Sequence, residues 1–578
     1  MNKVIILFFI SLTSLNIWAQ QPKDTLNTEE INVVKPYQPK ISDAFKIKAN
    51  PSISNESVEK QGVDYTIKSM PVASTFTPSK GKAKSVKRAK KERLYDNYIS
   101  AGFGNYTTPL VEAYMRTFPN RDSEFGALIK HHSSQGGIKD VKLDDSFYKT
   151  SVAVYYKNST RDKDWNISMG ADHSLFHWYG LPETTTFAET LLDTINSKQA
   201  YFNFKLDGEV LLYNSSFKGL KASVNRLSDA YESTEIRARI QPQFELPISS
   251  ELFTIDLDLD LLNGNFEKNY LNNTSLNYSY INLGVNPSFE VLRDYFSMTL
   301  GAKLYYTVTN ENIGKTFNAY PNIDVSYQIV DEVFTVFGGV TGGMNFNTYN
   351  DKTAKNPYLS PNFYSKPTDE KYRAYAGFKG KLASNMSYLL KASYADQRDK
   401  AFYLLNNIQT LGTLPVLQPY LLGNSFSVVY DDTKTLAFHG ELGIDFSKEF
   451  TFGGSVDYAT YRTETILEAW NLPNLKATVF GDYHTGKWTG NAKLFFIGER
   501  NDLELPSYIL RILVVEKDHI VSAKAYADLN LGVSYSFSDR LSAFAKANNL
   551  LGSNYDSYYN YPTQGIQVLA GITFKFDL

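Results

Sequence analysis

Strict alternation of apolar and polar residues is the clearest pattern in this chain, and it recurs from Asn97 onward. In Phe253–Leu261, apolar residues at the odd positions alternate with one threonine and three aspartates. A longer segment, Val521–Phe537, alternates over 17 residues. A period of two places the two sets of side chains on opposite faces of a β-strand. Because a tilted strand crosses a bilayer in roughly 9–11 residues, we expect Val521–Phe537 to be one strand that projects beyond the membrane.

Short turn sequences separate the alternating segments at ten places. They are 119–122, 158–164, 213–216, 248–251, 293–295, 330–332, 384–387, 447–449, 484–487 and 538–540. Aromatic residues flank many of them, as in the girdle of a membrane barrel. If all ten turns and both ends of the barrel lie on one side, the turns join eleven hairpins. The sequence therefore predicts an all-β fold, a transmembrane antiparallel β-barrel of about 22 strands over residues 96–578, the size of the plugged outer-membrane transporters.

Longer connections fall between these turns and belong at the opposite end of the predicted barrel. They are 175–197, 263–276, 346–369, 398–432, 499–518 and 551–565. Two stretches within them, Tyr403–Asn424 and Leu505–Val515, are apolar. Apolar surface left in water costs about 25 cal/mol per Å², and large exposed patches mark interfaces.

Two interpretations of these apolar stretches stay open: they fold into the barrel mouth and close the lumen, or they bind a partner protein. The candidate residues are Tyr403, Leu404, Leu405, Leu421, Leu422, Tyr508, Ile509 and Leu510. A 22-stranded barrel with an empty lumen would be a wide aqueous hole. We expect the barrel's own loops to close it, 398–432 and 499–518 foremost.

The C-terminal segment Asn548–Leu578 ends in an alternating run that finishes on Phe574 and Phe576, as a barrel-closing strand does. The segment resembles the C-terminal end of the TonB-dependent receptor family. The matching residues are Asn549, Leu550, Tyr555, Tyr561, Pro562, Gly565, Gly571, Phe574 and Phe576. Leu551 stands where the family often has Phe, and Ile566 where it usually has Arg. The resemblance implies an outer-membrane barrel that works in transport, and it does not specify the cargo.

The first residues differ in composition from the barrel. Residues 1–19 combine an early Lys3 with an apolar core and predict a secretory signal peptide. Residues 20–95 are polar and contain proline, which predicts an extended periplasmic segment. Eight basic residues lie between Lys80 and Arg93. They form either a solvated linker or a contact to anionic head groups or an acidic partner.

One stretch of this N-terminal segment resembles the short box that the family offers to TonB. Its residues are Glu29, Glu30, Ile31, Asn32, Val33 and Val34. Such a box would add a strand to the edge of a partner's sheet, although a short strand without that role fits the residues equally. The segment is too short for the family's plug domain. The sequence therefore leaves two functions: a TonB-dependent receptor-like transporter without the standard plug, or a scaffold subunit of an outer-membrane secretion or protein-assembly complex.

Composition and motifs exclude several other classes. Cysteine is absent, so there is no disulfide framework and no thiolate metal site. A net charge of −2 predicts no nucleic-acid partner. His173 and His177 have no third metal ligand, and the aspartates in 256–260 read as lumen-facing carboxylates rather than a calcium loop. No phosphate loop or nucleophile motif occurs. We expect no enzyme activity, no cofactor and no metal.

The expected surroundings follow from the barrel. Outer-membrane lipids surround it, TonB is a partner if the box functions, and other outer-membrane or periplasmic proteins are partners if the chain is a scaffold. The Asn-, Lys- and Tyr-rich composition, with the KPYQP segment, resembles that of Bacteroidota proteins. Alternation also predicts that Leu529 faces lipid, so that Leu529→Arg destabilises the wall, and that Asp528 faces the lumen, so that Asp528→Arg is tolerated.

Overall fold

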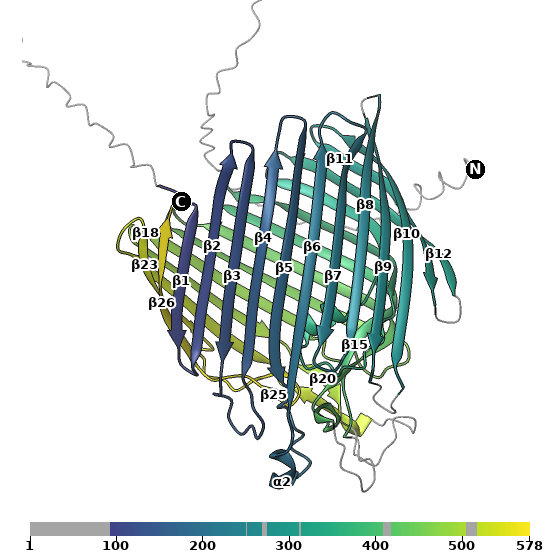
Figure 1. Cartoon of the computed structure of the whole chain (residues 1–578). Helices are drawn as coiled ribbons and strands as arrows, with labels where there is room; N and C mark the ends of the chain where they lie inside the picture. Colours follow the sequence, from purple (N-terminus) through teal and green to yellow (C-terminus); the bar gives the residue numbers. More distant parts are fainter. Residues whose placement is uncertain are drawn as a thin grey trace, which may run out of the picture. The chain divides into compact units, whose positions relative to one another are not determined.

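The computed structural model describes residues 93–249, 251–268, 274–310, 314–408, 418–504 and 517–577. All of them belong to one compact unit, residues 89–578. They form a closed antiparallel β-barrel (Figure 1). None of the helices among these residues is long and apolar enough to cross a membrane.

The barrel wall contains 22 strands, as the turn count predicts. The first eleven are β1 (Asn97–Gly104), β2 (Thr108–Asn120), β3 (Ser123–Ser134), β4 (Phe147–Ser159), β5 (Lys163–His177), β6 (Lys198–Leu212), β7 (Phe217–Asp229), β8 (Thr234–Ile248), β9 (Glu251–Phe266), β10 (Leu276–Leu292) and β11 (Phe296–Thr309). The other eleven are β12 (Lys315–Val330), β13 (Phe334–Asn345), β14 (Thr368–Ala383), β15 (Met386–Leu405), β16 (Phe426–Asp445), β17 (Phe450–Thr463), β18 (Leu475–Thr485), β19 (Trp488–Ile497), β22 (Tyr526–Ser536), β23 (Leu541–Asn548) and β26 (Gln567–Phe576).

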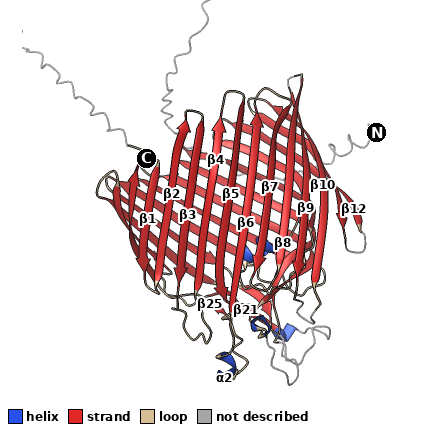
Figure 2. Cartoon of the chain, in the orientation of Figure 1, coloured by secondary structure: helices blue, strands red, loops and turns tan. Residues whose placement is uncertain are grey.

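A few short elements lie in the connections outside the wall. Two small hairpins pair β20 (Arg500–Leu503) with β21 (Ile520–Ala523) and β24 (Asp556–Tyr558) with β25 (Tyr561–Pro562). The helical elements are α2 (Glu189–Leu192), α3 (Tyr349–Lys355) and the 3₁₀ turns η1 (Pro419–Leu421) and η2 (Lys517–His519). Figure 2 shows how small the helical share of the fold is.

The first and last strands of the wall close the barrel. β1 pairs antiparallel with β26, from Asn97 opposite Phe576 to Gly104 opposite Leu569. β26 pairs on its other side with β23. Every strand of the described wall therefore has two neighbours, which removes the unpaired backbone groups of a sheet edge.

Wall strands alternate between two environments. In β10, Ile281, Leu283 and Val285 are 44%, 47% and 43% exposed on the outer face. Tyr280 and Asn282, which alternate with these residues, are buried on the lumen side. An apolar outer face and a polar lumen are what a barrel needs in lipid.

The two ends of the barrel differ, as the sequence predicts. All ten predicted turns join wall strands at one end, the turn end, which is uppermost in Figure 1. The long connections meet at the opposite end, the loop end. Two of these connections, 135–146 and 464–474, were not predicted from the sequence. The predicted loop 398–432 is shorter than expected, because β15 continues to Leu405 and β16 starts at Phe426.

The predicted single strand Val521–Phe537 is wrong. The chain leaves the wall between Ala523 and Tyr526, so that β21 pairs with β20 while β22 pairs with β19. The strand β20, which pairs with β21, also contacts β24. Arg500 donates hydrogen bonds to the carbonyls of Asp556, at 2.6 Å, and Ser557. Alternation continues through the bend and therefore could not reveal it.

Candidate functional site: the closed mouth of the barrel

One connection at the loop end folds into the lumen. This inserted loop, residues 346–367, joins β13 to β14 and carries α3. Thr348 begins the helix, because its hydroxyl accepts a hydrogen bond from the backbone N–H of Asp351 at 3.0 Å. The helix is the blue element seen against the inner wall near β8 in Figure 2.

Two carboxylates at the loop end of the wall hold α3. Glu235 of β8 is 3% exposed and accepts hydrogen bonds from the backbone N–H groups of Tyr349, at 2.7 Å, and Asn350, at 3.1 Å. It also accepts the hydroxyl of Tyr278 at 2.5 Å. Asp229 of β7 accepts the hydroxyl of Tyr349 at 2.8 Å. The two bonds to Glu235 from Tyr349 and Asn350 satisfy backbone donors that the first turn of a helix leaves free.

Tyrosine hydroxyls hold the rest of the inserted loop by donating to its backbone carbonyls. The pairs are Tyr201 to Pro357 at 2.9 Å, Tyr280 to Ser365 at 2.7 Å, Tyr403 to Lys352 at 3.0 Å, Tyr430 to Tyr364 at 2.9 Å and Tyr558 to Lys355 at 3.1 Å. A loop buried in a lumen must have its backbone groups paired. Four donors come from the wall strands β6, β10, β15 and β16 and one from β24 outside the wall, so the loop is bonded to distant parts of the barrel.

An aromatic cluster joins this loop to its neighbours. Tyr358 stacks on Tyr561 with 3.7 Å between ring centres, and Tyr179 lies 4.9 Å from Tyr561. Phe426 of β16 is 5.9 Å from the same ring. Tyr561 has no exposed surface. Burial raises the pKa of Tyr358 to about 12, so its hydroxyl stays protonated at neutral pH. Three connections and the first residue of β16 thus form one cap over the mouth.

The predicted loop residues occupy defined places in or beside this cap. Leu405, Leu421 and Leu422 are 1%, 5% and 1% exposed, Leu404 is also buried, and Tyr403 is half-buried. Tyr508, Ile509 and Leu510, and the segment Glu29–Val34, lie outside the described residues. Phe574 and Phe576 lie in β26 and stack at 5.9 Å. The described apolar residues therefore have cover within the chain itself.

The carboxylates that hold α3 were not among the predicted site residues. Glu235 and Asp229 stand at strand ends in polar surroundings and resemble any other lumen-facing acid in sequence. Their role depends on β7 and β8 facing a loop more than 100 residues away. Only the acidic character of these two positions in an aromatic-rich region could have drawn attention to them.

The aspartates of β9 face the lumen, as expected, but not as free carboxylates. Asp258 forms a two-bond ion pair with Arg239, at 2.8 and 2.7 Å, and Asp260 forms one with Arg237, at 2.9 and 2.6 Å. His177 lies 3.5 Å from Asp144. No group of three or more metal-ligating side chains occurs among the described residues.

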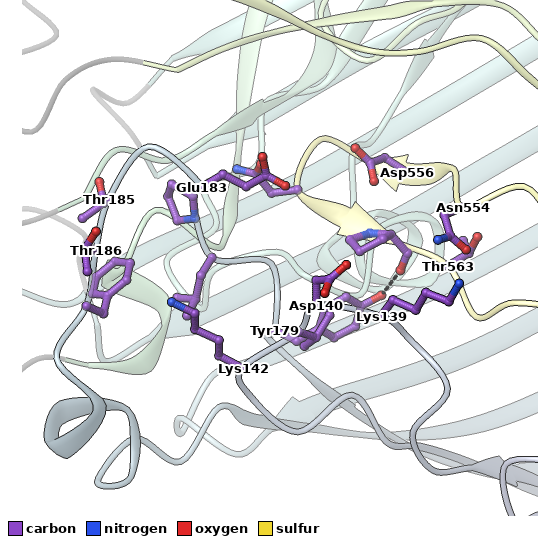
Figure 3. Close-up of a pocket in the computed structure, with 16 residues that line it drawn as sticks. Lys139, Asp140, Lys142, Tyr179, Glu183, Thr185, Thr186, Asn554, Asp556 and Thr563 are labelled. Carbon is purple, nitrogen blue, oxygen red and sulfur yellow. Dashed lines mark hydrogen bonds between the residues drawn. The ribbon is translucent and has the colours of Figure 1, made fainter.

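A pocket opens beside the cap, between the connections 135–146, 178–197 and 549–566. Its volume is about 340 Å³. Figure 3 shows Lys139 and Lys142 on one side of it and Glu183 and Asp556 on the other. Tyr179 forms part of the base, and its hydroxyl donates to the carbonyl of Pro562 at 3.0 Å. We call this cavity the outer pocket.

Comparisons with known proteins bear on the fold. No protein-family model matches the sequence, and no curated protein is similar to it. Solved structures are similar in three dimensions: the FrpB iron transporter from Neisseria meningitidis has a TM-score of 0.63 at 11% identity, covering 84% of this chain and 82% of that one. The siderophore receptor PirA from Acinetobacter baumannii gives 0.61 at 12% identity over 84% and 81%. FpvA from P. aeruginosa, bound to a heterologous pyoverdine, gives 0.60 at 10% identity over 83% and 72%. This chain therefore shares the barrel fold of these iron and siderophore receptors.

Proposed function

We propose that the protein is an outer-membrane barrel of the receptor type that admits a solute through a mouth closed by its own inserted loop. The turn end faces the periplasm and the loop end faces outward, as short turns and long loops do in such barrels. The fold it shares with iron and siderophore receptors supports a role in transport.

One observation carries the proposal: the inserted loop crosses the lumen and bonds to strands on both sides of it. Tyr201 and Tyr280 hold it on one side, and Tyr430 holds it on another. A closure with many individually modest bonds can open when a ligand shifts the balance.

Deletion of part of the loop tests the closure. Replacement of residues 349–364 by a short Gly-Ser linker should give large conductance steps in planar bilayers and sensitise cells to large antibiotics. Deletion of Glu189–Leu192, an external helical turn, is the control and should do neither. If the 349–364 deletion leaves conductance unchanged while removal of residues 21–90 opens the pore, closure belongs to the N-terminal segment and the proposal fails.

Energised uptake requires a further assumption, that Glu29–Val34 binds TonB. Deletion of residues 28–35 should then abolish uptake of the solute while the protein stays in the membrane. If uptake persists after this deletion, the solute crosses the barrel without TonB and the barrel is passive.

The alternative function is a scaffold subunit of an outer-membrane secretion or protein-assembly complex. Its sequence support came from apolar loops, yet Leu404, Leu405, Leu421 and Leu422 are covered by the protein's own cap. The remaining support is the predicted lack of a standard plug domain, the apolar residues 505–515, which lie outside the described residues, and the basic run Lys80–Arg93. A pull-down in mild detergent separates the two functions: a stoichiometric partner favours the scaffold, and a lone barrel favours the receptor.

A further inference from the structure

The outer pocket is lined by five acidic or basic side chains that form no ion pair with one another. They are Lys139, Asp140, Lys142, Glu183 and Asp556. None of them lies within 4.0 Å of an oppositely charged group in the described part of the chain, whereas other lysines at the barrel surface and lumen do form ion pairs. The pocket therefore presents charges of both signs to whatever occupies it.

Lys139 and Lys142 lie apart from Glu183 and Asp556, and Asp140 lies on the side of the lysines in Figure 3, so that side carries two basic groups and one acidic group. Both lysines belong to the connection 135–146. Burial raises the pKa of Asp556; the guanidinium of Arg500 opposes this shift and the Glu183 carboxylate adds to it. Lys524 also opposes the shift, but neither Glu183 nor Asp556 forms an ion pair within 4.0 Å among the described residues, so both carboxylates can accept an ammonium ligand.

The walls of the pocket are held in place before any ligand arrives. Asp145 accepts the backbone N–H groups of Gly136, at 2.8 Å, and Ile138, at 3.2 Å, which folds the loop that presents the lysines. Arg500 holds the backbone of Asp556 at 2.6 Å. Tyr179, 7% exposed, fixes the base against Pro562. Preorganised walls lower the cost of binding.

The remaining lining completes the chemistry. Thr185, Thr186, Thr563, Asn554 and Asn560 offer hydroxyl and amide groups, and Val141, Leu181, Pro182 and Phe187 offer apolar surface. The volume, about 340 Å³, lies at the lower end of small-ligand pockets, which span roughly 300–1,000 Å³. It suits a short ligand that has both charged ends and peptide-like hydrogen-bonding groups.

We propose that the outer pocket binds a short zwitterionic peptide, with its ammonium group at Glu183 and Asp556 and its carboxylate at Lys139 and Lys142. This assignment rests on the proposed function, because it names the class of solute that the receptor takes. Binding of this peptide involves no change in covalent bonds.

Calorimetry on the full-length protein in detergent micelles tests the assignment. The probes are triglycine, N-acetyl-triglycine, triglycine amide and the neutral trisaccharide maltotriose. Triglycine should bind about tenfold or more tightly than either blocked form, since each block removes one charge-assisted contact. Maltotriose should not bind measurably.

Two pairs of substitutions assign the ends. Lys139→Ala with Lys142→Ala should weaken triglycine to the affinity of its amide and leave the amide unchanged. Glu183→Gln with Asp556→Asn should weaken the binding of triglycine to the affinity of N-acetyl-triglycine and leave the affinity of N-acetyl-triglycine unchanged. Lys198→Ala and Glu189→Gln, exposed residues outside the pocket lining, are the matched controls. Heat-modifiable migration in gels checks that each variant is folded.

Equal affinities for the three peptides, tighter binding of maltotriose, or variants that leave the preferences intact would overturn the assignment. The outcomes separate it from the proposed function. Specific peptide binding by a barrel whose 349–364 deletion opens no pore supports the pocket and contradicts the transport role. If the 349–364 deletion opens a pore but the protein binds the three peptides equally, the transport role is supported and the peptide assignment of the outer pocket is contradicted.

Discussion

The hydroxyl of Tyr349 in α3 donates a hydrogen bond of 2.8 Å to Oδ2 of Asp229 at the end of β7, 120 residues earlier in the chain. Tyr349 has no exposed surface, and its ring lies 5.0 Å from Phe266 and 5.6 Å from Phe363. The side chain thus fixes α3 by its ring and by its hydroxyl together. This division of roles makes the two contributions separable by substitution.

Tyr349→Phe should loosen α3 without disturbing the barrel. Asp229 still accepts hydrogen bonds from the backbone N–H groups of Tyr231 and Ser233, both at 2.9 Å, so its carboxylate remains hydrogen-bonded. We expect a loss of about 1 kcal/mol in the local stability of residues 349–355. Hydrogen exchange by mass spectrometry measures it, with Tyr213→Phe at the turn end as control. Unchanged exchange of α3 would show that the hydroxyl does not hold the helix.

Glu235→Ala should have a larger effect on the same helix. It removes the acceptor of two backbone N–H groups and of Tyr278, and each buried donor left unpaired costs about 1–3 kcal/mol. Glu235→Gln keeps one acceptor oxygen and should lie between the parent and the alanine variant. The measurement is single-channel conductance, in which brief openings should become frequent. Equal conductance of the parent and Glu235→Ala would contradict the closure that we propose.

Leu531→Arg should disrupt the wall. Leu531 is 39% exposed on the outer face of β22, and an arginine facing lipid costs about 2–4 kcal/mol near the membrane midplane. Ser534→Arg, on the lumen face of the same strand, is the matched control and should assemble. The fraction of heat-modifiable, membrane-inserted protein reports the difference, and equal yields would reverse the face assignment.

Asp528→Arg should not be tolerated, which corrects the expectation from alternation alone. The residue does face the lumen, but it is 3% exposed and accepts the hydroxyl of Tyr555 at 2.8 Å. An arginine there would displace Tyr555 from its stack on Tyr526, where the ring centres are 3.8 Å apart. Assembly yields as high as those of Ser534→Arg would contradict this correction.

Lys352→Met should tighten the closed loop at neutral pH. Burial lowers the pKa of Lys352 to about 8, and Lys355 adds to the shift. Between about pH 8 and the ordinary lysine value of 10.5, the open loop binds more protons than the closed one, so rising pH favours closure. Methionine removes both the penalty and its pH dependence. Cleavage of residues 346–367 by proteinase K at pH 7 and 9.5, normalised to an unfolded substrate, checks this. Lys198→Met is the control, since Lys198 is exposed and lies outside the inserted loop. Cleavage of the parent that does not slow at pH 9.5 would contradict the prediction.

The sequence by itself determined the wall of this protein. A strand in a membrane barrel has one face in lipid and one in the lumen, so apolar and polar residues alternate along it. The short turns between strands are recognised by turn-forming residues that are adjacent in sequence. Ten turns such as 213–216 and 293–295 were therefore enough to predict 22 strands. The pairing of β26 with β1 closes that wall and leaves each strand with two neighbours.

Only the tertiary structure decided how the mouth is closed. The prediction placed 398–432 and 499–518 foremost, and parts of both lie outside the described residues. Among the described residues, the inserted loop 346–367 accepts hydrogen bonds from wall strands far apart around the barrel. Its anchors, Glu235 and Asp229, are brought to α3 by the curvature of the barrel, and no local pattern records which loop a lumen-facing acid will meet. The same holds for the bend after Ala523 and for the outer pocket, where three separate connections present their charges. Alternation is a property of one strand, whereas these features depend on side chains far apart in sequence satisfying each other's hydrogen bonds.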